Sequence, residues 1–176
     1  MCELEHSELI RPYCKHDFEQ VERLWASINR ELAPPHMRER FEQYIAAALA
    51  DELQRLLEIF SPTRRNAFWV VVSGPQIIGT FGIESRSDDT TELRRMYLDR
   101  EHRGRGLAQR MLRFAEEHAR QLGFTRVILS TAEIQTAALK LYTNNGYVLT
   151  DTVRAETMST KTVGGGLIRY HFQKRL

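Results

Sequence analysis

The chain has 176 residues, of which 42% are hydrophobic and 27% are charged, and its formal net charge is +2. This length suits one domain, the composition argues against disorder, and the nearly balanced charge does not by itself indicate nucleic-acid binding. Two cysteines, Cys2 and Cys14, argue against a disulfide framework, and no apolar run approaches the roughly 18 residues of a membrane span. We therefore expect a single domain over residues 1–176, located in the cytoplasm, with neither membrane nor nucleic acid as a partner.

The first third of the chain predicts a short strand followed by two helices. The strand is expected over residues 8–13, and a helix with its apolar residues on one face is expected over 16–32. Pro34 and Pro35 end this helix. The apolar period of 3.6 residues then resumes, which predicts one long amphipathic helix over 37–60.

From residue 67 the pattern alternates between strands and helices. Runs rich in β-branched and aromatic residues predict strands, and apolar stripes that end at a glycine predict helices. A tight turn, Gly-Pro-Gln, joins the first two strands, which must then be antiparallel, whereas a helix between neighbouring strands favours parallel pairing. The sequence thus predicts an α/β fold with a mixed sheet and helices on both faces. Strands are expected over 67–73, 77–85, 91–99, 126–131, 147–158 and 166–176, with helices over 106–122 and 134–145.

The segment EHRGRGLAQRML, residues 101–112, places two glycines where a strand leads into a helix. Glycine weakens a helix by about 1 kcal/mol per interior position, so Gly104 and Gly106 require a tight turn or a close approach to the backbone. The start of a helix presents unpaired N–H groups and partial positive charge, which favours a phosphate site. Arg103 and Arg105 could add cations. A glycine-rich helix start without a ligand is the alternative.

This segment lacks the lysine and hydroxyl of a P-loop, and Gln109 stands where the dinucleotide motif has its third glycine. Arg103-x-x-Gly106-x-Ala108 instead matches the R/Q-x-x-G-x-G/A signature of the GNAT superfamily of acetyl-CoA-dependent N-acetyltransferases. ELRRMYLDREHRGRGLAQRML resembles the fourth strand, pyrophosphate loop and third helix of that family, and AALKLYTNNGY resembles its fourth helix and the next strand. The resemblance covers about residues 67–150. It implies a mostly antiparallel sheet of six to seven strands, splayed at the fourth strand.

The resemblance implies that acetyl-CoA is the cosubstrate and that the main chain makes most of its contacts. Pantetheine is expected beside Met96, Tyr97 and Leu98, with the Met96 N–H as the donor to the thioester oxygen. Gln135 stands where family members often carry an asparagine that contacts the cofactor arm. The pyrophosphate is expected on the N–H groups of Arg103, Gly104, Arg105, Gly106, Leu107, Ala108 and Gln109.

Three side chains are candidates for the chemistry of acetyl transfer. The resemblance implies Tyr142 as the general acid, since a phenol with a pKa near 10 can protonate a thiolate with a pKa near 8.5. A tyrosine that only packs on the sheet is the alternative. Glu92 is implied as a base acting through water, Glu84 competes with it, and water alone could take the proton. The six histidines show no metal-binding spacing, so we expect no metal.

The acceptor is expected to be a small primary amine. A protein N-terminus or lysine is the second hypothesis, a CoA-binding regulatory domain without activity is the third, and dimers are common in the family. The carboxylates of the helix over 37–60 would suit a cationic acceptor, although exposed helix faces are usually charged for solubility. Residues 162–168 could form a lid or a slack hairpin turn. The carboxylates in question are Glu39, Glu42, Asp51, Glu52 and Glu58.

Overall fold

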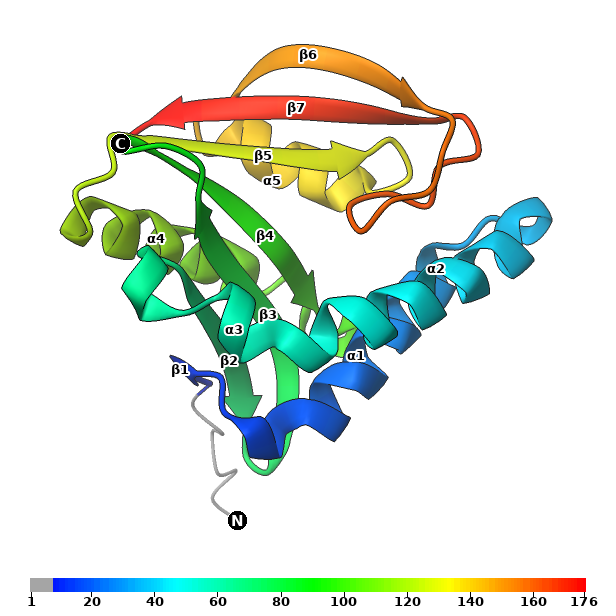
Figure 1. Cartoon of the computed structure of the whole chain (residues 1–176), viewed down its shortest axis with the longest axis horizontal. Helices are drawn as coiled ribbons and strands as arrows, with labels where there is room; N and C mark the ends of the chain where they lie inside the picture. The colour runs from blue at the N-terminus through cyan, green and yellow to red at the C-terminus, as the bar shows by residue number, and fades with distance from the viewer. Residues whose placement is uncertain (1–7) are drawn as a thin grey trace.

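The computed structural model describes residues 8–176, apart from the side chain of Leu49, so Cys2 lies outside the described residues. Within them, seven strands form one sheet in the order β1-β2-β3-β4-β5-β7-β6 (Figure 1). Only β4 and β5 are parallel, and the other neighbours are antiparallel, which confirms the predicted mixed sheet. The strands are β1 Leu9–Pro12, β2 Ala67–Ser73, β3 Gln76–Ser85, β4 Thr90–Leu98, β5 Arg126–Ala132, β6 Val148–Ala155 and β7 Leu167–Arg175.

Helices cover both faces of the sheet, as predicted. One face packs against α1 and α3, and the other packs against α4 and α5 (Figure 1). On α4, Met111 and Ala115 are buried against β2–β4 whereas Arg113 is exposed, so the apolar stripe is the buried face. The helices are α1 Phe18–Leu32, α2 Arg38–Asp51, α3 Leu56–Ile59, α4 Leu107–Gln121 and α5 Thr136–Asn144.

The prediction of one long helix over residues 37–60 is wrong. The first α-helix of this segment ends at Asp51, a short 3-10 turn over Leu53–Arg55 follows, and α3 is a separate helix over Leu56–Ile59. Glu52 is only 3% exposed, and its carboxylate accepts a hydrogen bond of 3.0 Å from Arg95 Nε and lies 3.0 Å from Arg94 Nη2. A buried carboxylate must meet cations or donors, and this requirement breaks the helix where Glu52 turns toward the sheet.

β4 diverges from β5 along its second half. The two strands pair only from Thr90 to Glu92, while β3 pairs with β4 from Thr91 to Leu98 with one interruption. A bulge in β4 leaves Arg95 and Met96 without partners in β3, and Arg95 adopts a φ of +52°. The predicted splay at the fourth strand is thereby confirmed, and the bulged backbone faces the opening between the strands.

Candidate active site

The start of α4 forms an open anion site. Gly104 and Gly106 have φ values of +77° and +79°, and no atom lies within 4 Å of the position a Cβ would take at either. No side chain caps α4, and its first turn closes with a 3.0 Å hydrogen bond from Arg110 N to Gly106 O. The preceding N–H groups are therefore free to bind a diphosphate. The glycines serve both the turn and the close approach.

An outer cleft adjoins this anion site. We use this name for the cavity of about 560 Å³ between the end of β4, residues 103–106 and the start of α5. Arg105 is exposed outside this cleft, and the Leu107 side chain is buried in the core. The other predicted cofactor residues line it: Met96, Tyr97, Leu98, Arg103, Gly104, Gly106, Ala108, Gln109 and Gln135.

The polar side chains of the outer cleft brace its walls. The Arg103 guanidinium donates to Leu98 O at 2.9 Å and to the Glu31 carboxylate at 2.8 and 3.0 Å, so it is turned to α1. Gln135 Oε1 accepts from Thr131 Oγ1 and from Ala132 N, each at 2.9 Å. Main-chain N–H groups thus remain as the anion ligands at this end. Together with the cleft, they fit a ligand that has a diphosphate and a long narrow arm, as coenzyme A has.

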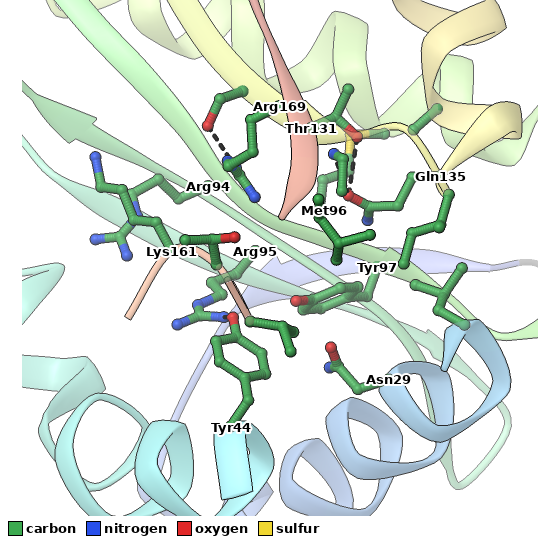
Figure 2. Close-up of a pocket in the computed structure, with 18 of the residues that line it drawn as sticks. Asn29, Tyr44, Arg94, Arg95, Met96, Tyr97, Thr131, Gln135, Lys161 and Arg169 are labelled. Atoms are coloured by element: carbon green, nitrogen blue, oxygen red, sulfur yellow. Dashed lines mark hydrogen bonds between the residues drawn. The ribbon is translucent and has the colours of Figure 1, made fainter. Parts of the chain in front are cut away.

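An inner pocket lies deeper in the splay. We use this name for the cavity walled by α1, α2, α5, β4, β5, β7 and the β6–β7 loop, with Asn29, Tyr44, Lys161 and Arg169 among its polar residues (Figure 2). The inner pocket and the outer cleft share lining residues, so they meet at a common wall. The shared residues include Met96, Tyr97, Gln135 and Tyr142.

Tyr142 stands at this common wall. Its side chain is buried, and its hydroxyl lies 3.9 Å from Met96 Sδ. The rings of Tyr147 and Phe172, at 5.7 and 6.2 Å, fix its orientation. Burial, with a smaller contribution from Tyr97, raises the pKa of the Tyr142 phenol, so the hydroxyl keeps its proton at neutral pH.

The two predicted base candidates face each other across β3 and β4, where Arg86 binds both carboxylates. Glu92 also accepts from Lys161 Nζ at 2.7 and 2.9 Å, and Glu84 accepts from Arg94 at 2.6 Å. Burial by itself raises the pKa of Glu92, but hydrogen bonds and charge from Lys161 and Arg86 outweigh it and lower the pKa. Glu92 lines the inner pocket, and Glu84 is not among its lining residues.

Arg95 of β4 connects this strand to α2 and to the β6–β7 loop, which are three walls of the inner pocket. This role was not identified from the sequence. The Arg95 guanidinium is 5% exposed and donates to Tyr44 Oη at 2.8 Å, to Thr160 O at 2.7 Å and to both oxygens of Glu52. The one available signal is the pair of adjacent arginines, Arg94 and Arg95, in an otherwise buried strand. Regular alternation would send their side chains to opposite faces, whereas the bulge lets both reach Glu52.

The β6–β7 loop, residues 156–166, is anchored to α2. Arg40 Nε donates to Val163 O at 2.9 Å, and Tyr44 Oη donates to Thr160 O at 3.3 Å. A Cβ on Gly165 would lie 2.9 Å from the Met37 side chain, so the turn is closely packed. The loop is therefore a fixed wall of the inner pocket, neither an open lid nor a slack turn.

The expectation of a cationic acceptor loses its structural basis. Of the carboxylates on the segment 37–60, Glu52 is buried against arginines, and the other four are exposed and absent from the lining of the inner pocket. Residues 8–176 contain no group of three or more potential metal ligands. Nor does any helix in that range have the length and apolar character needed to span a bilayer.

The fold and the site define a protein that binds a diphosphate-bearing ligand in a splayed sheet beside a polar pocket. The family model described as "Acetyltransferase (GNAT) family" matches residues 18–147, and the chain belongs to this family. Its members take the acetyl group from acetyl-CoA. Human N-acetyltransferase 8B is 31% identical over 110 residues, 60% of this chain and 48% of that protein. N-acetylaspartate synthetase of Danio rerio is 34% identical over 105 residues, 59% of this chain and 37% of that protein.

The chain spans about half the length of the human relative and less of the fish relative. Among solved structures, the PaiA N-acetyltransferase of Thermoplasma acidophilum in complex with coenzyme A superposes with a TM-score of 0.74. It is 17% identical, and the match covers 97% of this chain and 99% of that one. An Elizabethkingia anophelis GNAT acetyltransferase with acetyl-CoA bound gives a TM-score of 0.61 at 14% identity, covering 98% of this chain and 100% of that one. At these identities the likeness shows the fold alone.

Proposed function

We propose that the chain is an acetyl-CoA-dependent N-acetyltransferase that acts on the primary amine of a small molecule. The amine attacks directly while both substrates are bound. The observation that carries this proposal is the common wall: the outer cleft and the inner pocket meet at Met96, Tyr97 and Tyr142. Two reactants that enter from opposite sides would be held together at this wall, which lowers the entropic cost of their reaction.

Acetyl-CoA supplies an acetyl group activated as a thioester. The bulge leaves the main chain of Met96 without a partner in β3, and β5 has already diverged, so the Met96 N–H can donate to the thioester oxygen as charge develops there. Tyr142 donates its proton to the sulfur as the carbon–sulfur bond breaks and the carbon–nitrogen bond forms. The burial that raises the pKa of Tyr142 also disfavours a bare thiolate beside it.

The attacking amine must lose a proton, so a base is needed on the inner-pocket side of the common wall. Of the two candidate carboxylates, Glu92 lines the inner pocket, so we assign it this role through a bridging water. Its lowered pKa keeps it ionised, as an acceptor must be, but also makes it a weak base. The rate of acetyl transfer is therefore governed by the fraction of the amine substrate that is already uncharged.

A small acceptor is favoured by the walls of the inner pocket. Six secondary-structure elements and the anchored β6–β7 loop surround it. An extended peptide would need an open groove along the sheet, whereas Arg95 and Tyr44 join the loop to β4 and α2. The name of the Danio rerio relative denotes synthesis of an N-acetylated amino acid, and the acceptor for such a product is a small primary amine.

Substitution of Tyr142 by phenylalanine tests the proposal. We expect Tyr142→Phe to lower kcat for thiol release from acetyl-CoA by about 100-fold or more, the typical contribution of a general acid, with an unchanged acetyl-CoA Kd. Tyr147→Phe is the matched control, because Tyr147 is also buried, contacts the ring of Tyr142 and is absent from the lining of both cavities. Equal kcat values in the two variants would show that Tyr142 is not the general acid. Acetyl-CoA binding without thiol release for any amine would contradict the transferase proposal itself.

A further inference from the structure

Among the cations of residues 8–176 that line the inner pocket, Arg169 is the one that has no carboxylate within 4.0 Å. It lies on β7, opposite Ala132 of β5, and its guanidinium reaches the inner pocket (Figure 2). Its recorded side-chain hydrogen bond runs from Nη2 to Ser130 Oγ at 2.6 Å. A guanidinium has five N–H donors in a fixed plane, so most of its donors remain for a ligand.

The surroundings of Arg169 leave positive charge uncompensated. In the described part of the chain, three carboxylates face five cations at the inner pocket and the β3–β4 end beside it. Each of these cations except Arg169 has a carboxylate partner. Burial disfavours the charged form of Arg169 and so lowers its pKa. Because the ordinary pKa of arginine lies far above neutral, the side chain stays charged, and the burial of this charge costs free energy. The carboxylates are Glu52, Glu84 and Glu92, and the cations are Arg86, Arg94, Arg95, Lys161 and Arg169.

We propose that the amine acceptor carries a carboxylate and that Arg169 binds it. This inference rests on the proposed function and names the chemical class of its acceptor as an amino acid or a related amino carboxylate. The planar fork of a guanidinium matches the two oxygens of a carboxylate, and Ser130 fixes the fork by holding one of its nitrogens.

Binding of this kind would also orient the acceptor. With its carboxylate on Arg169 at the β5–β7 side, the amine of a small acceptor is directed toward the common wall, where Met96 and Tyr142 lie. Lys161 cannot replace Arg169 in this role, because its ammonium is held by both oxygens of Glu92. A polyamine would bring a second cation against Arg169 and is therefore disfavoured.

The experiment compares matched acceptors with wild-type protein, Arg169→Met and Arg175→Met. Each amino acid is tested beside its carboxamide, its decarboxylated amine and its phosphonate and sulfonate analogues, by thiol release from acetyl-CoA. Arg175 is the matched control because it lies on the same strand, is exposed and is absent from the lining of the inner pocket.

We expect wild type to favour the carboxylate over the uncharged partner, and Arg169→Met to lower kcat/KM for the carboxylate by about 10- to 100-fold, mainly through KM. The carboxamide should change little, and Arg175→Met should match wild type. Acetylation of uncharged or cationic amines in preference to carboxylates, or a preference that survives in Arg169→Met, overturns the inference while the transferase function stands. A preference for phosphonate or sulfonate would assign the site to a different anion and overturn it as well.

A binding measurement separates this inference from the proposed function. Calorimetry with N-acetylated amino acids and the protein saturated with coenzyme A needs no turnover. Binding that is lost in Arg169→Met and kept in Arg175→Met supports carboxylate recognition even if no amine is acetylated, in which case only the proposed activity fails. Absence of such binding to wild-type protein overturns the carboxylate site.

Discussion

At the scale of single residues, Arg95 shows the clearest conflict between local backbone preference and the contacts of the folded chain. A φ of +52° is unfavourable for a residue with a long side chain, by roughly 1–3 kcal/mol. The guanidinium compensates by binding Glu52, Tyr44 and the carbonyl of Thr160, and by lying 4.8 Å above the ring of Trp25. Both the strained backbone and these compensating contacts belong to the bulge beside Met96, which lines the outer cleft.

Gly106 is the residue where backbone conformation and ligand approach can be separated by experiment. Gly106→Ala places a Cβ at a φ of +79°, which costs about 1 kcal/mol of folding stability, and puts a methyl group into the space open to the diphosphate. We expect the acetyl-CoA Kd to rise at least about tenfold, measured by calorimetry, because the anion can no longer approach the N–H groups.

Gly123→Ala provides the control for this prediction. Gly123 follows the other end of α4, has a φ of +84° and would meet only Arg65 Nη2 at 3.7 Å. The loss of stability should be similar and the acetyl-CoA Kd unchanged. Equal affinities in the two variants would mean that Gly106 is needed for the turn alone.

At the scale of elements, sequence periodicity predicts most boundaries within a few residues, because most helices and strands present an apolar face to the core. The break after Asp51 was not predictable, since the apolar period continues through residues 37–60. The cause is the contact of Glu52 with Arg95, which lies 43 positions further along the chain. The β6–β7 loop was misjudged for a similar reason. Three glycines indicate freedom, but Arg40 and Tyr44 of α2 hold this loop in place.

Arg40→Met should loosen the β6–β7 loop while leaving the outer cleft intact. The substitution keeps an apolar side chain against Gly165 but removes the donors to Val163 O and Glu156 O, each worth about 1 kcal/mol. We expect faster amide hydrogen exchange in residues 156–166 and an acceptor KM raised about fivefold, with an unchanged acetyl-CoA Kd. Arg38→Met, at an exposed position on the same helix, should do neither. An unchanged KM beside faster exchange would show that the loop does not shape the acceptor site.

At the scale of the whole molecule, the two halves of the site differ in how far sequence could predict them. Most of the outer cleft is built from two continuous stretches, residues 96–109 and 134–142, with α1 as a third wall, so the main-chain geometry of its anion site follows a local motif. The inner pocket brings together Asn29, Tyr44, Lys161 and Arg169 from segments that are far apart in sequence. No local pattern marks these residues, and only the sheet order, with β7 between β5 and β6, places Arg169 beside the splay.

Three titratable side chains make the stability of the whole molecule depend on pH in two steps: His118, Glu92 and Asp17. Burial against Trp69, with ring centroids 4.9 Å apart, lowers the pKa of His118 from 6.5, so below that value the unfolded chain binds a proton that the folded chain resists. The free energy of unfolding should therefore decrease as pH falls below 6.5. Glu92 and Asp17 have pKa values lowered from 4.5 and 3.8, and their stabilisation is present above those values and lost as pH falls through the folded pKa values.

Urea unfolding measured from above pH 6.5 to below pH 4.5 tests both steps. His118→Gln, which cannot titrate, should remove the upper slope. Glu92→Gln should reduce the lower slope, while Asp17 and the exposed carboxylates Glu42, Glu58 and Asp89, whose pKa values are also lowered, sustain the rest. An upper slope that survives in His118→Gln would assign it to another group. The steps differ in location, since His118 lies on α4 at the core whereas Glu92 lines the inner pocket. A ligand bound in that pocket should therefore alter the lower step and leave the upper step unchanged.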